Sequence, residues 1–120
     1  MSPATANELA RISLLSALPG ETLGRLAQVM VREDVAAGVS IVREGDPGDR
    51  FYIVLRGMLS VTQAARGARG VLRPGDSFGE VALTMDVPRT ATVHTLTPAV
   101  VASCDRAAFD EFIRPLFADD

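Results

Sequence analysis

Residues 74–93, PGDSFGEVALTMDVPRTATV, place a short helix-like run between strand-like segments. Glu80 opens the apolar run at residues 81–85, whose length and composition favour one or two helical turns. Arg89 follows a turn that contains a proline, and the alternating run at residues 91–93 favours a strand. The stretch therefore predicts a small helix with a carboxylate at its start and a guanidinium just after its end.

Short β-type runs separated by Gly-rich turns occupy the sequence on both sides of this stretch. Their number and regular spacing predict a mainly β fold with flanking helices, an eight-stranded antiparallel jelly-roll β-barrel. A roll needs no helix between its sixth and seventh strands, so the inserted helix indicates a function. We expect residues 67–70 to form a hairpin tip. The predicted strands cover residues 31–36, 39–42, 51–55, 58–63, 71–72, 91–95 and 99–103.

Helical patterns precede and follow the strands. After a loose tail of four residues, Thr5 and Glu8 have the spacing of a capping box, and Pro19 suits the first turn of a second helix. Asp105 is a candidate N-cap for a last helix, which we expect Pro115 to stop or kink near residue 114. The apolar residues at helical spacing are Leu9, Ile12, Leu15, Leu23, Leu26, Ala27, Met30, Phe109, Phe112, Ile113 and Leu116.

The composition narrows the functional classes. A chain of 120 residues with 48% hydrophobic residues suffices for one compact domain. Its net charge of −3 provides no overall basic face for nucleic acid. The single cysteine, Cys104, cannot form an internal disulfide, and a single histidine, His94, argues against a metal site of several imidazoles. With no signal peptide and no apolar run of membrane-spanning length, we expect a cytoplasmic protein without a membrane segment.

The chemistry of the inserted helix points to a ligand with both a negative charge and hydroxyls. Gly79 allows close backbone approach, and the N–H groups of Val81 and Ala82, in the first helical turn, are available to an anion. Arg89 provides a planar fork of donors suited to phosphate oxygens. Glu80 repels phosphate but accepts a hydrogen bond from a sugar hydroxyl. A 3′,5′-cyclic nucleotide, which has a phosphate and a free ribose 2′-hydroxyl, satisfies all of these groups.

A simpler interpretation gives these residues no ligand. Glu80 can serve only as a first-turn carboxylate that favours the helix dipole. Arg89 can be a surface side chain, or form an ion pair with Glu80 or Asp86. The order of glycine, glutamate, short helix and arginine between two strand signals favours the ligand-binding interpretation.

The sequence also resembles the cyclic nucleotide-binding domains of cyclic-nucleotide-dependent kinases, channels and catabolite activator protein-like regulators. Their hallmark is similar to F-G-E-φ-A-L, where φ is apolar, then a short turn and P-R-[A/S/T]-A-x-V. Residues 78–83 read FGEVAL and residues 88–93 read PRTATV, without an insertion between the motifs. The resemblance extends over about residues 8–117. Its outer parts are residues 41–49, residues 51–54, Gly57 and residues 72–76.

The resemblance implies a role for each residue of the motif. Glu80 is implied to bind the ribose 2′-hydroxyl, and Arg89 with the N–H of Ala82 the cyclic phosphate. Gly79 is implied to permit the approach. Thr90 follows the arginine, where a hydroxyl can contact phosphate or a guanine, and this does not separate cAMP from cGMP. The implied ligand is cAMP or cGMP, and no cofactor or metal is expected.

The resemblance further implies a single cyclic nucleotide-binding domain over residues 1–120. We expect N-terminal helices in residues 1–30, a β-roll in residues 31–104 that contains the cassette of residues 75–93, and a C-terminal helix in residues 105–120. Members of the family usually have one more helix, which covers the base or forms a dimer seam. This sequence shows none, so an additional lid, the preferred base and the oligomeric state stay open.

Three functions compete at this point. The first is a regulatory module that binds a cyclic nucleotide, performs no chemistry and signals through its helical flanks to a fused or separate effector domain. The second keeps the fold as an interaction scaffold or as a sensor of another small effector. The third, a jelly-roll enzyme of the cupin type, ranks lowest because His94 alone cannot supply the ligands of its metal.

Overall fold

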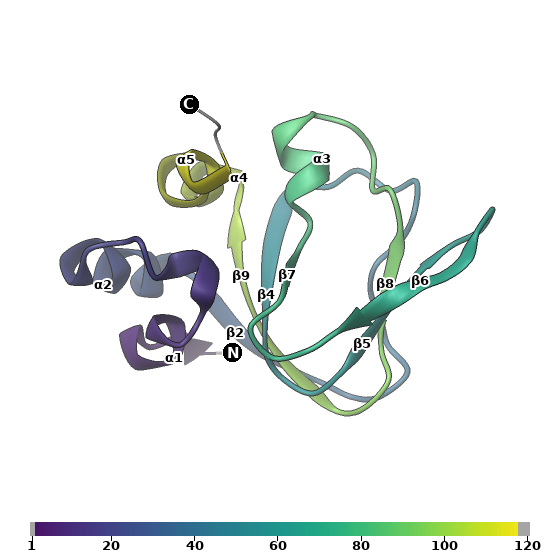
Figure 1. The fold of residues 1–120 in the computed structure, drawn as a ribbon, viewed down its shortest axis with the longest axis horizontal. Coiled ribbons are helices and arrows are strands. Elements are labelled where there is room, and N and C mark those ends of the chain that lie inside the picture. The colour runs from purple at the N-terminus through teal and green to yellow at the C-terminus, as the bar shows by residue number, and fades with distance from the viewer. Residues whose placement is uncertain (1, 118–120) are drawn as a thin grey trace.

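The computed structural model describes residues 2–117 as two antiparallel sheets with the N-terminal and C-terminal helices gathered at one side (Figure 1). One sheet has the strand order β1-β2-β9-β4-β7, and the other has the order β3-β8-β5-β6. The strands are β1 (Ser2–Pro3), β2 (Val31–Val35), β3 (Ser40–Val42), β4 (Arg50–Arg56), β5 (Leu59–Gln63), β6 (Gly67–Leu72), β7 (Ser77–Phe78), β8 (Thr92–Thr95) and β9 (Ala99–Asp105).

The predicted mainly β roll is confirmed. Strands β2 to β9 form its eight strands, and the inserted helix α3 (Glu80–Thr84) lies between the sixth and the seventh of them. Residues 2 and 3, expected in a loose tail, instead pair with β2 in the register Ser2↔Arg32 and Pro3↔Val31. The edge of β2 left open by the roll accepts this short strand, and buried Ala4 follows it.

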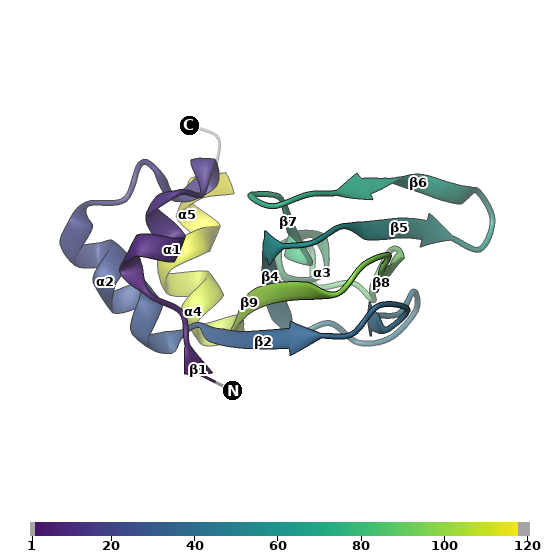
Figure 2. The same cartoon turned by 90° about the horizontal axis from the view of Figure 1, so that it is seen from below.

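The β5–β6 hairpin differs from the prediction at its tip. Residues 67–70, expected as the tip, begin strand β6, and the turn lies at residues 64–66. The pairs Val61↔Gly70 and Thr62↔Ala68 leave one extra residue in β6, which is a β-bulge. Glycines at this spacing thus mark a bulged edge strand, which projects from the roll on the side away from the N-terminal helices (Figure 2).

The N-terminal helices are α1 (Ala6–Ala10), the 3₁₀ turn η1 (Ser13–Leu15) and α2 (Gly20–Val29). The predicted capping box is confirmed, since Thr5 Oγ1 accepts from the N–H of Glu8 at 3.1 Å and the Thr5 N–H donates to Glu8 Oε1 at 3.1 Å. Pro19 is the N-cap of α2. None of the helices in residues 2–117 has the length and apolar character that crossing a membrane requires.

The C-terminal helix consists of α4 (Arg106–Ala108), the π-turn η2 (Phe109–Ile113) and α5 (Arg114–Phe117). Asp105 caps it as predicted, because its side chain accepts from the N–H of Ala108 at 2.9 Å. Of the two predicted outcomes, a stop near residue 114 is wrong, and a kink there stays a prediction. The wider π-turn comes just before this proline and gives its ring room, so the helix continues to Phe117. The part of the prediction on residues 118–120 lies outside the described residues.

The alternation of side chains along β4 divides the core into two parts. Phe51 and Ile53 face the helices, where they pack with residues such as Leu26 and Phe109. Val54 faces the interior of the roll, and Tyr52 packs against that second cluster. Because both faces of β4 are covered, its sequence is a nearly continuous apolar run. The strand thereby connects the helical layer with the interior on which α3 rests.

Candidate functional site at the inserted helix

Gly79 makes the sharp entry from β7 into α3 possible. Its φ of 97° lies in the left-handed region, which side chains rarely adopt. A Cβ at this position would lie 2.8 Å from Arg89 Nη1 and 2.9 Å from the carbonyl oxygen of Arg50. Gly79 also offers no side-chain cap, so the N–H groups of the first turn of α3 stay available.

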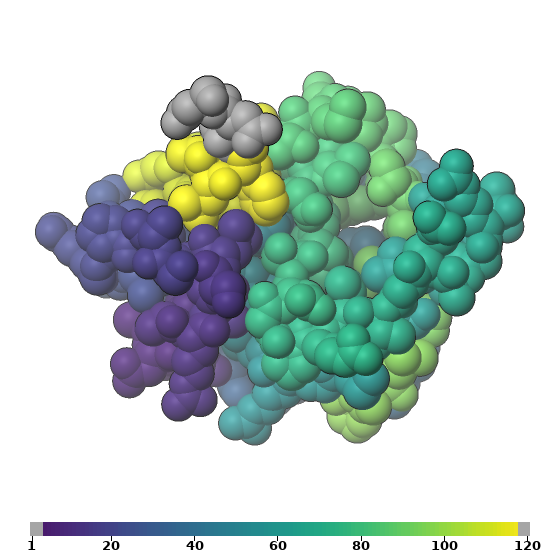
Figure 3. Space-filling model, viewed as in Figure 1, coloured from purple at the N-terminus to yellow at the C-terminus, as the bar shows by residue number. Residues whose placement is uncertain are grey.

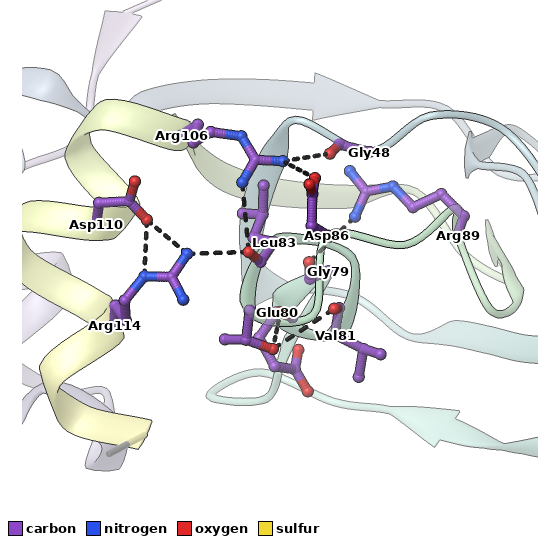
Figure 4. A network of polar contacts seen from close by, with 11 residues as sticks. Gly48, Gly79, Glu80, Val81, Leu83, Asp86, Arg89, Arg106, Asp110 and Arg114 are labelled. Atoms are coloured by element: carbon purple, nitrogen blue, oxygen red, sulfur yellow. Dashed lines mark hydrogen bonds and ion pairs between the residues drawn. The ribbon is translucent and has the colours of Figure 1, made fainter.

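The guanidinium of Arg89 lies beside this turn, next to Gly79 (Figure 4), and the residue is only 7% exposed. Its Nη1 donates to the carbonyl oxygen of Gly79 at 3.2 Å, and its Nη2 donates to that of Arg50 at 2.8 Å. The backbone of Arg89 is held as well, because its N–H donates to Asp46 O and its carbonyl accepts from Gly45 N, both at 2.8 Å. The hydrogen-bond partners of the Arg89 side chain and backbone are therefore neutral carbonyls and amides.

No carboxylate in the described part of the chain forms an ion pair with Arg89. The alternative of an ion pair with Glu80 or Asp86 is thus wrong, and so is the alternative of a surface side chain. Burial lowers the pKa of the Arg89 guanidinium from its ordinary value, while Tyr52, Asp49 and Glu80 oppose this shift at longer range. The site holds a positive charge whose desolvation is only partly compensated, an arrangement that favours a bound anion.

The structure brings all six predicted site residues to one cavity of about 230 Å³ between α3 and the interior of the roll. The molecular surface is hollowed between α3 and the β5–β6 hairpin (Figure 3). The predicted residues on the cavity wall are Gly79, Glu80, Val81, Ala82, Arg89 and Thr90. The apolar side chains on this wall come from Val42, Val61, Leu72, Phe78, Ala91 and Val93.

Two residues that support Arg89 were missed by the sequence reasoning. A Cβ on Gly48 would lie 2.6 Å from Arg89 Nε and 2.7 Å from Ala82 Cβ, so the β3–β4 turn touches both the arginine and α3. Tyr52 lies with its ring centroid 5.9 Å from the Arg89 Cζ. Gly48 belongs to the turn of residues 44–49, where glycine predicts only a change of chain direction. Gly48 and Tyr52 contact Arg89 only in the folded protein, so the sequence around each of them does not indicate these contacts.

The other end of α3 is held by the C-terminal helix (Figure 4). The carbonyl oxygen of Leu83 accepts from Arg114 Nη2 at 2.9 Å and from Arg106 Nη1 at 3.3 Å. Asp110 orients Arg114 through a hydrogen bond of 2.9 Å to its Nε. Asp86, whose φ of 54° is unusual for a residue other than glycine, lies 3.6 Å from Arg106 Nη2. These contacts connect the cassette to the helical layer.

Two other residues considered from the sequence lie away from the cavity. Cys104 is fully buried in the helical core cluster, and burial raises the pKa of its thiol to about 12. It therefore stays a neutral core side chain at physiological pH. His94 lies in β8, where it pairs with Ser40 and Ser60. Within residues 2–117 there is no cluster of three or more His, Cys, Asp or Glu side chains suited to a metal ion.

Comparison with known proteins identifies the class that this roll and cavity define. The family profile for the cyclic nucleotide-binding domain matches residues 32–115, so the chain belongs to the cyclic nucleotide-binding domain family. The cAMP-dependent protein kinase regulatory subunit of Debaryomyces hansenii is 36% identical over 87% of this chain and 23% of its own length. The cGMP-dependent protein kinase egl-4 of Caenorhabditis elegans is 34% identical over 92% of this chain and 15% of its own length.

Solved structures agree on the fold. The regulatory domain of Toxoplasma gondii PKA with cAMP superimposes with a TM-score of 0.88 at 28% identity, over 92% of this chain and 44% of that one. The regulatory subunit of a cAMP-independent protein kinase A from Trypanosoma brucei gives 0.88 at 26% identity, over 92% and 40%. The chain spans about a quarter of the length of the fungal regulatory subunits it matches. Those relatives are regulatory subunits of kinases.

Proposed function

We propose that this chain binds a 3′,5′-cyclic nucleotide and acts as a regulatory sensing module. The observation that carries the proposal is the buried guanidinium of Arg89, which has only carbonyl partners among the described residues. It shares a cavity with the Glu80 carboxylate. A cyclic phosphate supplies an anion for the Arg89 guanidinium, and the adjacent ribose 2′-hydroxyl supplies a hydrogen-bond donor for the Glu80 carboxylate.

Each residue of the cassette has a proposed role. Arg89 and the first-turn N–H groups of Val81 and Ala82 bind the phosphate oxygens, and Gly79 permits their close approach. Glu80 accepts from the ribose 2′-hydroxyl. Thr90 lies on the cavity wall, where its hydroxyl is available to phosphate or base. The Gln63 side chain supports this position by donating to the Thr90 carbonyl at 2.9 Å.

The proposed output is mechanical and not chemical. We propose one domain over residues 1–120, with helices in 1–30 and 105–120 around the roll of 31–104. Leu83 lies in the last turn of the cassette helix, and its carbonyl is held by the C-terminal helix, so occupancy of the cavity can be passed to the helical layer and from there to an effector. The proposed partners are a cyclic nucleotide and an effector domain in the cytoplasm, with no catalytic role for this chain.

Calorimetric titration with cAMP and with cGMP tests the proposal. Wild type should bind at least one of them, and Arg89→Ala should weaken that binding by about 2–5 kcal/mol, or roughly thirtyfold or more. The loss is large because the variant removes a buried charge-assisted contact. Millimolar or absent binding of both nucleotides by wild type would remove the proposal.

A second candidate is the sensing of another small effector or a scaffold role without a ligand. One observation favours it: the structural neighbour from Trypanosoma brucei is the regulatory subunit of a cAMP-independent kinase. A thermal-shift screen separates the candidates, because a ligand that binds only the folded state raises the melting temperature. Stabilisation by a nucleoside or another metabolite, without stabilisation by cAMP or cGMP, would support this candidate.

A further inference from the structure

The ring of Tyr52 extends beneath the cassette, next to the guanidinium of Arg89. Tyr52 lies in β4 opposite Phe78 of β7, and their rings stack at a centroid distance of 4.8 Å with an interplanar angle of 6°. The Arg89 Cζ lies over the Tyr52 ring at 5.9 Å from its centroid, within the range of a cation–π contact. Phe78 in turn lies on the wall of the cavity.

The hydrogen bonds of Arg89 do not fix the guanidinium fully. Both known acceptors, the carbonyls of Gly79 and Arg50, lie at the edge of the planar group. These two contacts leave the guanidinium free to move on its other sides. The Arg89 Cζ lies over the face of the Tyr52 ring, which limits movement on that side, and the stack on Phe78 restrains the ring itself.

We propose that Tyr52 is a positioning residue, whose ring holds the Arg89 guanidinium in the orientation that receives the ligand phosphate. This inference rests on the proposed function, because it concerns the same arginine. The ring acts through its face and not through its hydroxyl, since the hydroxyl forms no hydrogen bond with any residue that the structure describes. Tyr52 does not line the cavity at α3, so we place it behind Arg89, where it acts on the ligand through the arginine.

The electrostatics of the pair agree with this geometry. Burial raises the pKa of the Tyr52 phenol, with Arg89 as the largest opposing influence, so the ring stays neutral at physiological pH. In the other direction, Tyr52 is the strongest of the groups that oppose the lowering of the Arg89 pKa. Each of the two residues is thus a principal neighbour of the other.

Two substitutions separate the ring from the hydroxyl. Tyr52→Phe keeps the face contact and should retain the cyclic nucleotide affinity of wild type within about twofold. Tyr52→Leu keeps an apolar side chain but removes the ring, and should weaken binding by about three- to thirtyfold. Circular dichroism and thermal unfolding establish that both variants are folded. Equal affinities of the leucine variant and wild type, or an equal loss in both variants, would overturn the inference.

A double-mutant cycle distinguishes positioning from general support of the fold. In an Arg89→Gln background, at protein concentrations that allow the weakened affinity to be measured, Tyr52→Leu should cause no further loss beyond about twofold. If Tyr52→Leu lowers the affinity by the same factor in both backgrounds, Tyr52 supports the roll in general, and the inference is overturned. Absence of nucleotide binding by wild type is a separate result, which counts against the proposed function itself.

Discussion

The two ends of α3 both meet arginine side chains, and they are held in opposite ways. At the first turn, Arg89 is 7% exposed and has carbonyl partners but no carboxylate among the described residues. At the last turn, Arg106 and Arg114 have side chains that are each 40% exposed and lie 3.6 Å and 2.8 Å from carboxylate oxygens. The same side chain thus appears once without a counter-ion and twice with one.

This difference assigns different tasks to the two ends. The charges of Arg106 and Arg114 are balanced within the protein and exposed to solvent, so these residues serve as structural ties to the Leu83 carbonyl. The charge of Arg89 is buried and has no carboxylate partner among the described residues, which is why we propose the first turn as the ligand-binding end. The five residues of α3 form fewer than two helical turns, so its two ends lie close together.

The largest expected effect distinguishes the two ends of α3 by the ligand group that each one affects. Glu80→Ala should lower the affinity for a nucleotide with a free 2′-hydroxyl by about ten- to a hundredfold, because a hydrogen bond to a charged group is lost. It should change the affinity for the 2′-deoxy analogue much less. Arg114→Ala, at the other end, should affect the two ligands equally. Calorimetry with both ligands measures this, and equal losses in Glu80→Ala would remove Glu80 from the ribose role.

An intermediate effect concerns the β3–β4 turn of residues 44–49, which lies against Arg89 at the first turn of α3. Gly48→Ala places a methyl group 2.6 Å from Arg89 Nε and 2.7 Å from Ala82 Cβ. Overpacking of this kind should lower the free energy of unfolding by about 1–3 kcal/mol and weaken nucleotide binding as well.

The matched control for this variant is Gly70→Ala, whose added Cβ meets no atom within 4 Å. Its unfolding free energy should stay within about 0.5 kcal/mol of wild type. Chemical denaturation measures both variants. A Gly48→Ala protein as stable and as tightly binding as wild type would show that the turn yields easily and does not constrain Arg89.

The smallest expected effect concerns the last turn of α3, where the Leu83 carbonyl accepts from Arg106 and Arg114. Arg114→Ala removes the 2.9 Å hydrogen bond to Leu83 O, while Arg106 keeps its own at 3.3 Å. We expect the free energy of unfolding to fall by about 0.5–1.5 kcal/mol. Arg69→Ala, at an exposed arginine in β6, is the control and should have almost no effect. If the two variants are equally stable, the tie to Leu83 contributes nothing measurable.

Local chemistry made much of this fold predictable. The capping box at Thr5 and Glu8 involves residues three apart, so the sequence contains all of it. The two-sided burial of β4 produces its apolar run, and the roll followed from such runs and their turns, although the two-residue strand β7 was not among the predicted ranges. The cassette was found for the same reason, since Gly79, Glu80 and Arg89 are close in sequence. Their roles toward a ligand stay predictions.

The features that escaped prediction depend on distant parts of the chain. Tyr52 and Gly48 reach Arg89 only because β4 and the turn before it fold beneath the cassette, and strand periodicity does not reveal that. Residues 67–70 look like a glycine-rich turn, but pairing with β5 makes them a bulged strand. Pro115 favours the end of a regular α-helix, but here the helix continues through it after the π-turn of residues 109–113.

The π-turn of residues 109–113 also sets how much variation in length this helix can absorb. Arg106 and Arg114 are eight residues apart, which in a regular α-helix separates their directions by about 80°. A π-turn accommodates one extra residue, so the pair behaves as if it were seven apart, about 20° from alignment. A helix one residue shorter and free of the π-turn would present the same two side chains to Leu83. By this geometry the chain can lose one residue here, together with the π-turn, and keep both arginines directed at the cassette.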